Sequence, residues 1–164
     1  MNMEQFRSFM PKGKMQNATA GTTVIAPINS GLRLIPNFVS IKPSFTCKLD
    51  KMIDRIWGRV KKDYYGQSHN PREFKMGSIV DSLCSSDIFV ISMVVKDEFG
   101  MIDSGALEKA LVKLCAFAKD NKGSVHISQY LIDDVPPLRE LLDKYCAANG
   151  INCYFYAYPS LPVM

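Results

Sequence analysis

Segments of strand length alternate with amphipathic helical segments along this chain, and this order constrains the fold more than any other feature. The resulting order, β-α-β-β-α-β-α-β, predicts a three-layer α/β/α domain in which helices cover both faces of a mixed, mostly parallel central sheet. The predicted strands are 22–28, 75–83, 87–95, 124–128 and 151–158, and the predicted helices are 46–65, 104–123 and 136–149.

Two of the helices are predicted from apolar residues that recur at i, i+3, i+4 and i+7 spacing. In 46–65 the first candidate cap is Thr46, whose hydroxyl can accept from the first-turn amides. In 104–123 Ser104 can cap the start and Gly123 suits a left-handed stop. In an open sheet of this kind, ligands bind beyond the carboxyl ends of the strands.

Proline interrupts the apolar stretch that follows the first predicted strand. Pro36 and Pro43 lie within it, and proline fits neither a helix interior nor a central strand. We therefore predict an ordered insertion at 30–48. The predicted domain is 22–159, preceded by a polar arm at 1–21 and followed by a short tail at 160–164.

Composition indicates a single globular domain. The chain has 164 residues, of which 47% are hydrophobic, and no run approaches the ~18 apolar residues of a membrane span. The first residues form no continuous apolar segment of the secretory type. The five cysteines show no C-x-x-C pair, so we predict no disulfide, no metal site and free thiols at Cys115 and Cys146. These features predict a reduced, cytoplasmic protein that does not contact membranes.

Positive charge is concentrated in the first half of the chain. Residues 1–75 hold 13 Lys and Arg against 5 Asp and Glu. A basic face can neutralise the phosphates of a nucleic acid, whereas Asp50, Asp54 and Asp63 are interleaved at spacings that allow ion pairs on a solvated helix. Both interpretations stay open. The candidate anion or nucleic-acid patch consists of Lys48, Lys51, Arg55, Arg59 and Lys62.

Two stretches, 74–95 and 102–128, carry the pattern of a known family. They resemble the middle and second half of a macro domain, the family that binds or processes ADP-ribose, and the resemblance covers roughly 22–159. Trp57 and Tyr64 are similar to the aromatic residues that end the family's first helix. The other matching positions are Phe74, Gly77, Leu107, Ala110, Leu111, Val125 and His126.

The resemblance implies that Asn29 takes the place of the asparagine that ends the family's first ligand strand, where it would orient a ribose hydroxyl. A turn residue that bonds its own backbone is the alternative. Tyr156 matches the family's aromatic position near adenine, although residues of a two-sided sheet are more often core than ligand platform. His126 lies inside a predicted strand, and we expect a core residue there.

The two ligand loops of the family are rich in glycine, and this chain departs from them. The first is represented by 30–48, with Gly31 alone, and the second by 128–134, with no glycine. Glycine lets the backbone approach a phosphate closely, so the sequence predicts a remodelled cleft. Side-chain donors from the loops could replace the lost backbone contacts. The candidate ligand-binding residues are Asn29, Ser30, Gly31, Ser128, Gln129, Tyr130 and Tyr156.

Three functions follow from these observations. The favoured hypothesis is a divergent macro-like module that binds a ligand or another protein without catalysis, with ADP-ribose or a related nucleotide as the small-molecule partner. The second is a hydrolase or phosphatase that acts on an ADP-ribose derivative. The third is nucleic-acid binding through the basic first half. We expect no cofactor, and the sequence identifies no catalytic residue.

Overall fold

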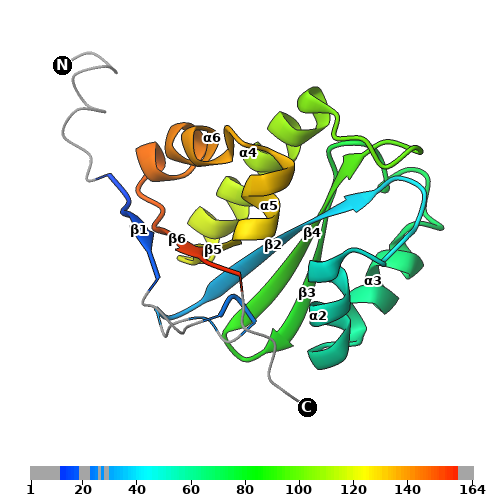
Figure 1. The fold of residues 1–164 in the computed structure, drawn as a ribbon, viewed down its shortest axis with the longest axis horizontal. Helices are drawn as coiled ribbons and strands as arrows, with labels where there is room; N and C mark the ends of the chain where they lie inside the picture. The colour runs from blue at the N-terminus through cyan, green and yellow to red at the C-terminus, as the bar shows by residue number, and fades with distance from the viewer. Residues whose placement is uncertain (1–11, 19–22, 26, 28–29, 159–164) are drawn as a thin grey trace.

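One six-stranded sheet organises the protein. The computed structural model describes residues 12–18, 23–25, 27 and 30–158, and its strand order is β1-β6-β5-β2-β4-β3 (Figure 1). β3 runs antiparallel to β4, and the other pairings are parallel. The strands are β1 Met15–Asn17, β2 Arg33–Ser40, β3 Ile79–Ser85, β4 Ile88–Lys96, β5 Ser124–Ser128 and β6 Cys153–Tyr156.

Helices cover both faces of this sheet, as predicted for a three-layer α/β/α fold. The chain moves in opposite directions along the sheet after β2 and after β4, and the helices of these two connections lie on opposite faces. Figure 1 shows α2 and α3 on one side and α4, α5 and α6 on the other. The helices are α2 Lys48–Ile56, α3 Arg59–Gln67, α4 Ser104–Asp120, α5 Gln129–Asp134 and α6 Leu138–Tyr145, with a 3₁₀ turn at Ala147–Asn149.

Two strand predictions in the first part of the chain are wrong. We expected 30–48 to contain no central strand, but β2 lies between β4 and β5. The recorded β2–β5 pairing stops at Leu34 and Val125, so Pro36, which lacks an N–H, lies past the ladder on that side. The predicted strand 22–28 is also wrong where the structure describes it, because Val24 and Ile25 form a turn.

The predicted helix 46–65 is two helices. α2 ends at Trp57, whose φ of −132° and ψ of 75° leave the helical region, and α3 begins after Gly58. The cap of α2 is Cys47 instead of Thr46, because the carboxylate of Asp50 accepts a hydrogen bond of 3.0 Å from the Cys47 N–H. This reciprocal arrangement fixes the start of α2.

The helix predicted at 104–123 begins and ends slightly differently. Its N-cap is Asp103 instead of Ser104, since the Asp103 carboxylate accepts a 2.8 Å hydrogen bond from the Ala106 N–H. α4 ends at Asp120, and the left-handed residue after it is Lys122, with φ of 54°, instead of Gly123.

The remaining strand predictions fit the structure closely. The hairpin of β3 and β4 and the short strand β5 are confirmed. The last strand is shorter than predicted and comprises Cys153–Tyr156. Met15–Asn17, inside the predicted polar arm, pairs with β6 as an edge strand. The loop predicted after Ser128 is instead the short helix α5.

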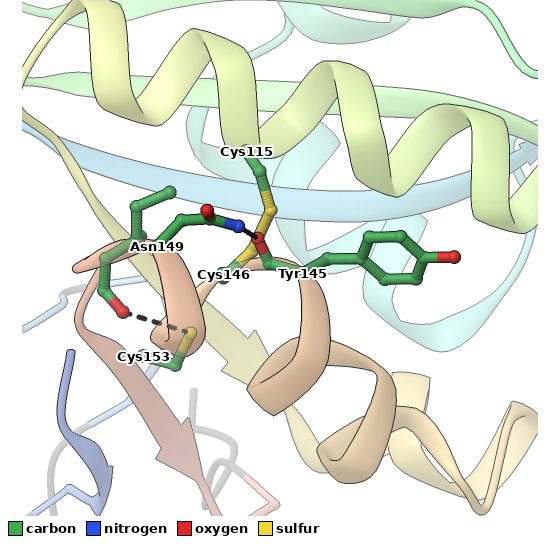
Figure 2. Close-up of a disulfide and its surroundings, with 6 residues drawn as sticks. Cys115, Tyr145, Cys146, Asn149 and Cys153 are labelled. Atoms are coloured by element: carbon green, nitrogen blue, oxygen red, sulfur yellow. Dashed lines mark hydrogen bonds between the residues drawn. A yellow bond between two sulfur atoms is a disulfide. The ribbon is translucent and has the colours of Figure 1, made fainter. Parts of the chain in front are cut away.

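A disulfide joins the two helices on one face, contrary to the predicted free thiols. Cys115 on α4 and Cys146 at the end of α6 are bonded, with their Cα atoms 5.4 Å apart (Figure 2). Each thiol lies on the apolar side of its helix, and the packing of α4 against α6 brings the two together. Sequence periodicity locates each face but does not pair the faces.

No helix in the described ranges has both the length and the apolar character needed to cross a membrane.

Candidate functional site

A cavity opens where β2 and β5 part at the carboxyl ends of the strands. The chain leaves β2 toward one edge of the sheet and leaves β5 toward the other, which is the arrangement that creates a ligand crevice in open α/β sheets. The cavity measures about 500 Å³, a size typical of small-molecule sites. We call it the Asn37 cavity; its lining consists of Asn37, Phe38, Cys47, Lys48, Leu49, Lys96, Tyr130, Leu131, Asp133, Asp134 and Tyr158.

Asn37 is a polar side chain in the otherwise apolar centre of β2. It is 2% exposed, and its Nδ2 donates a 2.7 Å hydrogen bond to Oδ1 of Asp50. The other carboxylate oxygen of Asp50 accepts from the Cys47 N–H. Among the described residues no hydrogen bond reaches Oδ1 of Asn37, so the side chain is held in place with an acceptor left for a ligand.

Burial dominates the protonation of Asp50. The carboxyl is 3% exposed, and loss of water raises its pKa, while the hydrogen bonds from Asn37 and Cys47 and the charge of Lys96 act in the opposite direction. The net effect is a raised pKa. Asp50 is not a lining residue of the cavity, and it supports the wall through its hydrogen bond to Asn37.

Two lysines border the same wall, which we call the lysine wall (Asn37, Cys47, Lys48 and Lys96). Lys48 is the first residue of α2. Lys96 ends β4 opposite Ser40 of β2, and its Nζ donates to the Cys47 Sγ at 3.7 Å. Neither lysine forms an ion pair with another described residue. Together with the amino end of α2, they make this wall favourable for an anion.

The opposite wall, which we call the acidic wall, consists of Tyr130, Asp133, Asp134 and Tyr158. Its frame is α5, which begins where the Ser128 hydroxyl accepts from the Tyr130 N–H at 3.2 Å. The rings of Tyr130 and Tyr158 are tilted, with centroids 5.0 Å apart. The Tyr158 hydroxyl donates to Asp133, which brings the segment after β6 against α5.

The same hydrogen bonds change the acidity of both partners. Donation from Tyr158 and from Gln129 Nε2 lowers the pKa of Asp133, and its hydrogen bond to Asp133 raises the pKa of the Tyr158 hydroxyl. Asp133 is therefore an anion at neutral pH, and Tyr158 remains a neutral donor.

The residues predicted for the second ligand loop have different roles in the structure. Tyr130 lines the Asn37 cavity. Gln129 donates to Asp133 at 3.1 Å and so supports the acidic wall. Ser128 is buried and caps α5. The predicted loop thus contributes to a cavity, but it does so through side chains on a helical turn.

The other described candidate residues, Ser30, Gly31 and Tyr156, lie away from the Asn37 cavity. Asn29 falls outside the described residues. Ser30 and Gly31 precede β2 at its amino end, and Ser30 lines a separate hollow. Tyr156 is buried and contacts His126 instead of the Asn37 cavity. The structure therefore does not bring Ser30, Gly31 and Tyr156 together with Tyr130.

His126 is fully buried and bonded on both ring nitrogens. Nδ1 and the Tyr156 hydroxyl are 2.7 Å apart, and Nε2 is 2.7 Å from the Ser124 hydroxyl and 3.2 Å from that of Ser30. Burial, with a smaller effect from the charge of Arg33, lowers the pKa of His126 to about 3. The imidazole is neutral at physiological pH, in agreement with the core role expected for it.

The basic patch predicted from sequence lies on α2 and α3. Arg59 is partly engaged, with an ion pair of 3.6 Å to Asp63 and a 2.8 Å hydrogen bond to the Leu83 carbonyl. Lys51, Arg55 and Lys62 are exposed, and Lys48 belongs to the Asn37 cavity. Nucleic-acid binding by this patch stays a prediction.

Metal-binding groups do not gather in the part of the chain that the structure describes: no three His, Cys, Asp or Glu side chains there could hold an ion together.

Sequence reasoning missed Asn37, Lys96 and Asp50. A signal for Asn37 was present, because one amide interrupts the buried apolar run 34–39. A signal for Lys96 was its position directly after the apolar strand 87–95. Pro36 masks the first signal, because it argues against a strand at 33–40. A lysine after a strand is too common to single out Lys96.

Comparison with solved structures reveals close similarity in fold at low sequence identity. A macrodomain protein from Streptomyces coelicolor superposes with a TM-score of 0.75 at 16% identity, covering 87% of this chain and 97% of that one. The macrodomain of Mycobacterium tuberculosis DarG gives a TM-score of 0.64 at 12% identity, covering 88% of this chain and 98% of that one. Neither a protein-family model nor a curated protein sequence matches the chain.

A third structure was determined with a ligand. Thermosipho africanus DarTG in complex with ADP-ribose gives a TM-score of 0.62 at 13% identity, and the match covers 81% of this chain and 40% of that one.

Proposed function

The chain has the macrodomain fold, and from this premise we propose that it binds ADP-ribose, or an ADP-ribosyl group on another molecule, in the Asn37 cavity. Similarity at 12–16% identity carries the fold alone, so support for the ligand comes from the cavity itself and from the ADP-ribose complex of a protein with a similar fold.

The observation that carries the proposal is the open Oδ1 of Asn37 at the base of a cavity bordered by two lysines. This oxygen has no protein partner among the described residues and is not sealed from solvent. A donor that enters the cavity can therefore reach it, and a ribose hydroxyl is a suitable donor. Lys48, Lys96 and the amino end of α2 favour a diphosphate at the same wall. The aromatic rings of Tyr130 and Tyr158 offer apolar contact across the cavity.

This geometry differs from a glycine-cradled phosphate site. The described residues of the cavity lining include no glycine, so side chains replace backbone amides as the donors. We therefore propose a binding module as the primary function, whose physiological ligand is free ADP-ribose or an ADP-ribosylated protein.

Calorimetric titration with ADP-ribose tests the proposal. We expect saturable binding that weakens about tenfold for Lys96→Met, because one charge-assisted contact to a phosphate is lost. Lys122→Met is the matched control, since Lys122 lies at the other end of the sheet and should leave the affinity unchanged. The absence of binding to the unmodified chain at millimolar ADP-ribose would overturn the proposal.

A second candidate function is hydrolysis of an ADP-ribosyl bond. One observation favours it: the amine of Lys96 and the carboxylates of Asp133 and Asp134 line the same cavity. In such a hydrolysis Asp133 or Asp134 would act as the general base and take a proton from a water whose oxygen attacks the anomeric carbon of the ribose. The bond from that carbon to the modified side chain would break, and the side chain would leave with a proton, while Lys96 holds the diphosphate.

Single-turnover assays on ADP-ribosylated peptides separate the two functions. A hydrolase would release ADP-ribose, and Asp133→Asn with Asp134→Asn would lower the rate while the Lys122→Met control would retain it. Binding without release on peptides modified at serine, glutamate and arginine would leave the binding module as the function.

A further inference from the structure

The two walls of the Asn37 cavity carry opposite charges that do not neutralise each other. Lys48 begins α2 and Lys96 lies beside Cys47 at the same helix end, whereas Asp133 and Asp134 lie on α5. The ion pairs found among the described residues are Arg33–Asp87 and Arg59–Asp63, and neither belongs to the cavity. Facing charges left unpaired across a cavity suit an occupant that carries both signs.

The lysine wall accounts for the anionic part of such an occupant, as argued above for a diphosphate. The acidic wall has the opposite preference. Asp133 is held as an anion by hydrogen bonds from Tyr158 and Gln129, and no hydrogen bond or ion pair of the Asp134 carboxylate occurs among the described residues. A second phosphate placed against this wall would be repelled.

The tyrosine rings strengthen that preference. Tyr130 and Tyr158 lie at the acidic wall with ring centroids 5.0 Å apart, and Asp133 is fixed to Tyr158 by its hydrogen bond. Aromatic faces within about 6 Å attract a cation through the ring quadrupole, most strongly when water is displaced. Rings and carboxylates together therefore form a binding surface for a planar cation.

The open acceptor of Asn37 is an independent indication that this cavity holds a ligand. The residue is 98% buried, as its 2% exposure shows, it lines the cavity, and its Oδ1 has no partner among the described residues. The two acids thus belong to a cavity that also offers a free acceptor from the core, and they are more than an isolated pair of surface acids.

We propose that the Asn37 cavity selects an ADP-ribosyl ligand whose ribose bears a cationic substituent, with the diphosphate at the lysine wall and the cation between Tyr130, Tyr158 and Asp133. The proposal rests on the proposed function and specifies its ligand class. Two sources supply this chemistry. One is the oxidised nicotinamide of NAD⁺, and the other is the guanidinium of an arginine that carries ADP-ribose.

A comparison of NAD⁺ with NADH tests the charge preference directly, because the two dinucleotides have nearly the same shape and differ in the charge of the nicotinamide ring. We expect NAD⁺ to bind about tenfold more tightly than NADH if the cation lies over the rings and beside the carboxylate. A peptide with ADP-ribosyl-arginine is compared in parallel with the same peptide carrying ADP-ribosyl-serine.

Two variants connect the preference to the acidic wall. The double substitution of Asp133→Asn and Asp134→Asn keeps the shape of the acidic wall and removes its charge. The cationic and the neutral member of each pair should then bind with about equal affinity. Asp120→Asn is the matched control, since Asp120 is exposed at the end of α4 and should retain the full preference.

The outcomes distinguish this inference from the function on which it rests. Failure of ADP-ribose itself to bind overturns both. Binding of ADP-ribose with equal affinity for NAD⁺ and NADH, and for the two peptides, overturns the cation preference alone. A preference confined to the dinucleotide pair identifies NAD⁺ as the source of the cation. A preference confined to the peptides identifies modified arginine. Either result supports the proposal if the Asp133 and Asp134 variants abolish that preference.

Discussion

The side-chain amide of Asn37 donates to the carboxylate of Asp50 over 2.7 Å and so joins the middle of β2 to the first turn of α2. The second oxygen of Asp50 accepts from the Cys47 N–H at 3.0 Å. One carboxylate therefore positions a cavity residue and begins a helix at the same time. The position of Asn37 depends on this arrangement, because its neighbours along β2 are buried apolar residues that offer its amide no partner.

We expect Asn37→Ala to lower the free energy of unfolding by about 1–3 kcal/mol, because it leaves a buried carboxylate oxygen without its donor. The same change should raise the pKa of Asp50 further, since the Asn37 hydrogen bond opposes the effect of burial. Urea denaturation measures the first effect and carboxyl NMR titration the second. A double-mutant cycle with Asp50→Ala is the control: additive losses in the cycle would show that the two residues do not act together.

The buried imidazole of His126 should make stability depend on pH. Its pKa is lowered from 6.5 to about 3 in the folded protein, so below pH 6.5 the unfolded chain takes up a proton that the folded chain refuses. Stability is therefore lost as the pH falls from about 6.5 toward 3. Between pH 7 and pH 5 the loss is about 2 kcal/mol.

Urea denaturation at several pH values checks this expectation. The slope between pH 7 and pH 5 should be strongly reduced in His126→Gln and retained in His69→Gln, because His69 is exposed. An unchanged slope in His126→Gln would assign the pH dependence to other groups.

The bond between Cys115 and Cys146 should stabilise the fold by about 2–4 kcal/mol, since it restricts the unfolded chain over a separation of 31 residues. We expect Cys115→Ser to lower the urea midpoint, and a reductant to lower the midpoint of the unmodified protein to a similar value. Cys84→Ser, at a free thiol, is the control. A midpoint that does not respond to reductant would show that the bond contributes little.

Replacing Tyr158 with phenylalanine keeps the ring and removes the hydroxyl that Asp133 accepts from. The pKa of Asp133 should then rise toward its ordinary value, since that hydrogen bond is the largest cause of its lowering. NMR titration of the Asp133 carboxyl measures the change. Tyr145→Phe, on α6 away from the cavity lining, should leave it unaltered; no rise in Tyr158→Phe would mean that the hydroxyl does not govern Asp133.

The sequence predicts the layers of this fold well because they depend on local periodicity. Apolar residues at helical spacing locate α4. The polar residues between the predicted strands 75–83 and 87–95 locate the hairpin of β3 and β4, whose turn is Ser86–Asp87. The alternation of these elements then restricts the sheet to a few topologies, and helices on both faces follow.

Propensity was misleading at β2. Pro36 argued against a central strand, but the ladder toward β5 ends before it at Leu34, so no hydrogen bond is lost on that side. This is a tertiary fact that no local pattern contains. Without this fact the expected ligand strand is 22–28, and Asn37 is not a candidate.

The candidate site was predicted in part. Tyr130 was chosen for its position after β5, which depends on sequence order, and it lines the cavity. The partners of Tyr130 were not predictable in the same way. Lys96 and Tyr158 line the same cavity as Tyr130 because the carboxyl ends of β4, β5 and β6 lie at the same end of the sheet.

The bond between α4 and α6 also closes the chain into a covalent ring that contains all of β5 and α5. A single cut by a protease anywhere in that ring would leave the pieces attached to each other and the mass on a non-reducing gel unchanged. A cut between β5 and α5 would thus separate Asp133 and Asp134 from β5 while the protein still migrates as one band. Samples from limited proteolysis of this protein therefore have to be reduced before electrophoresis.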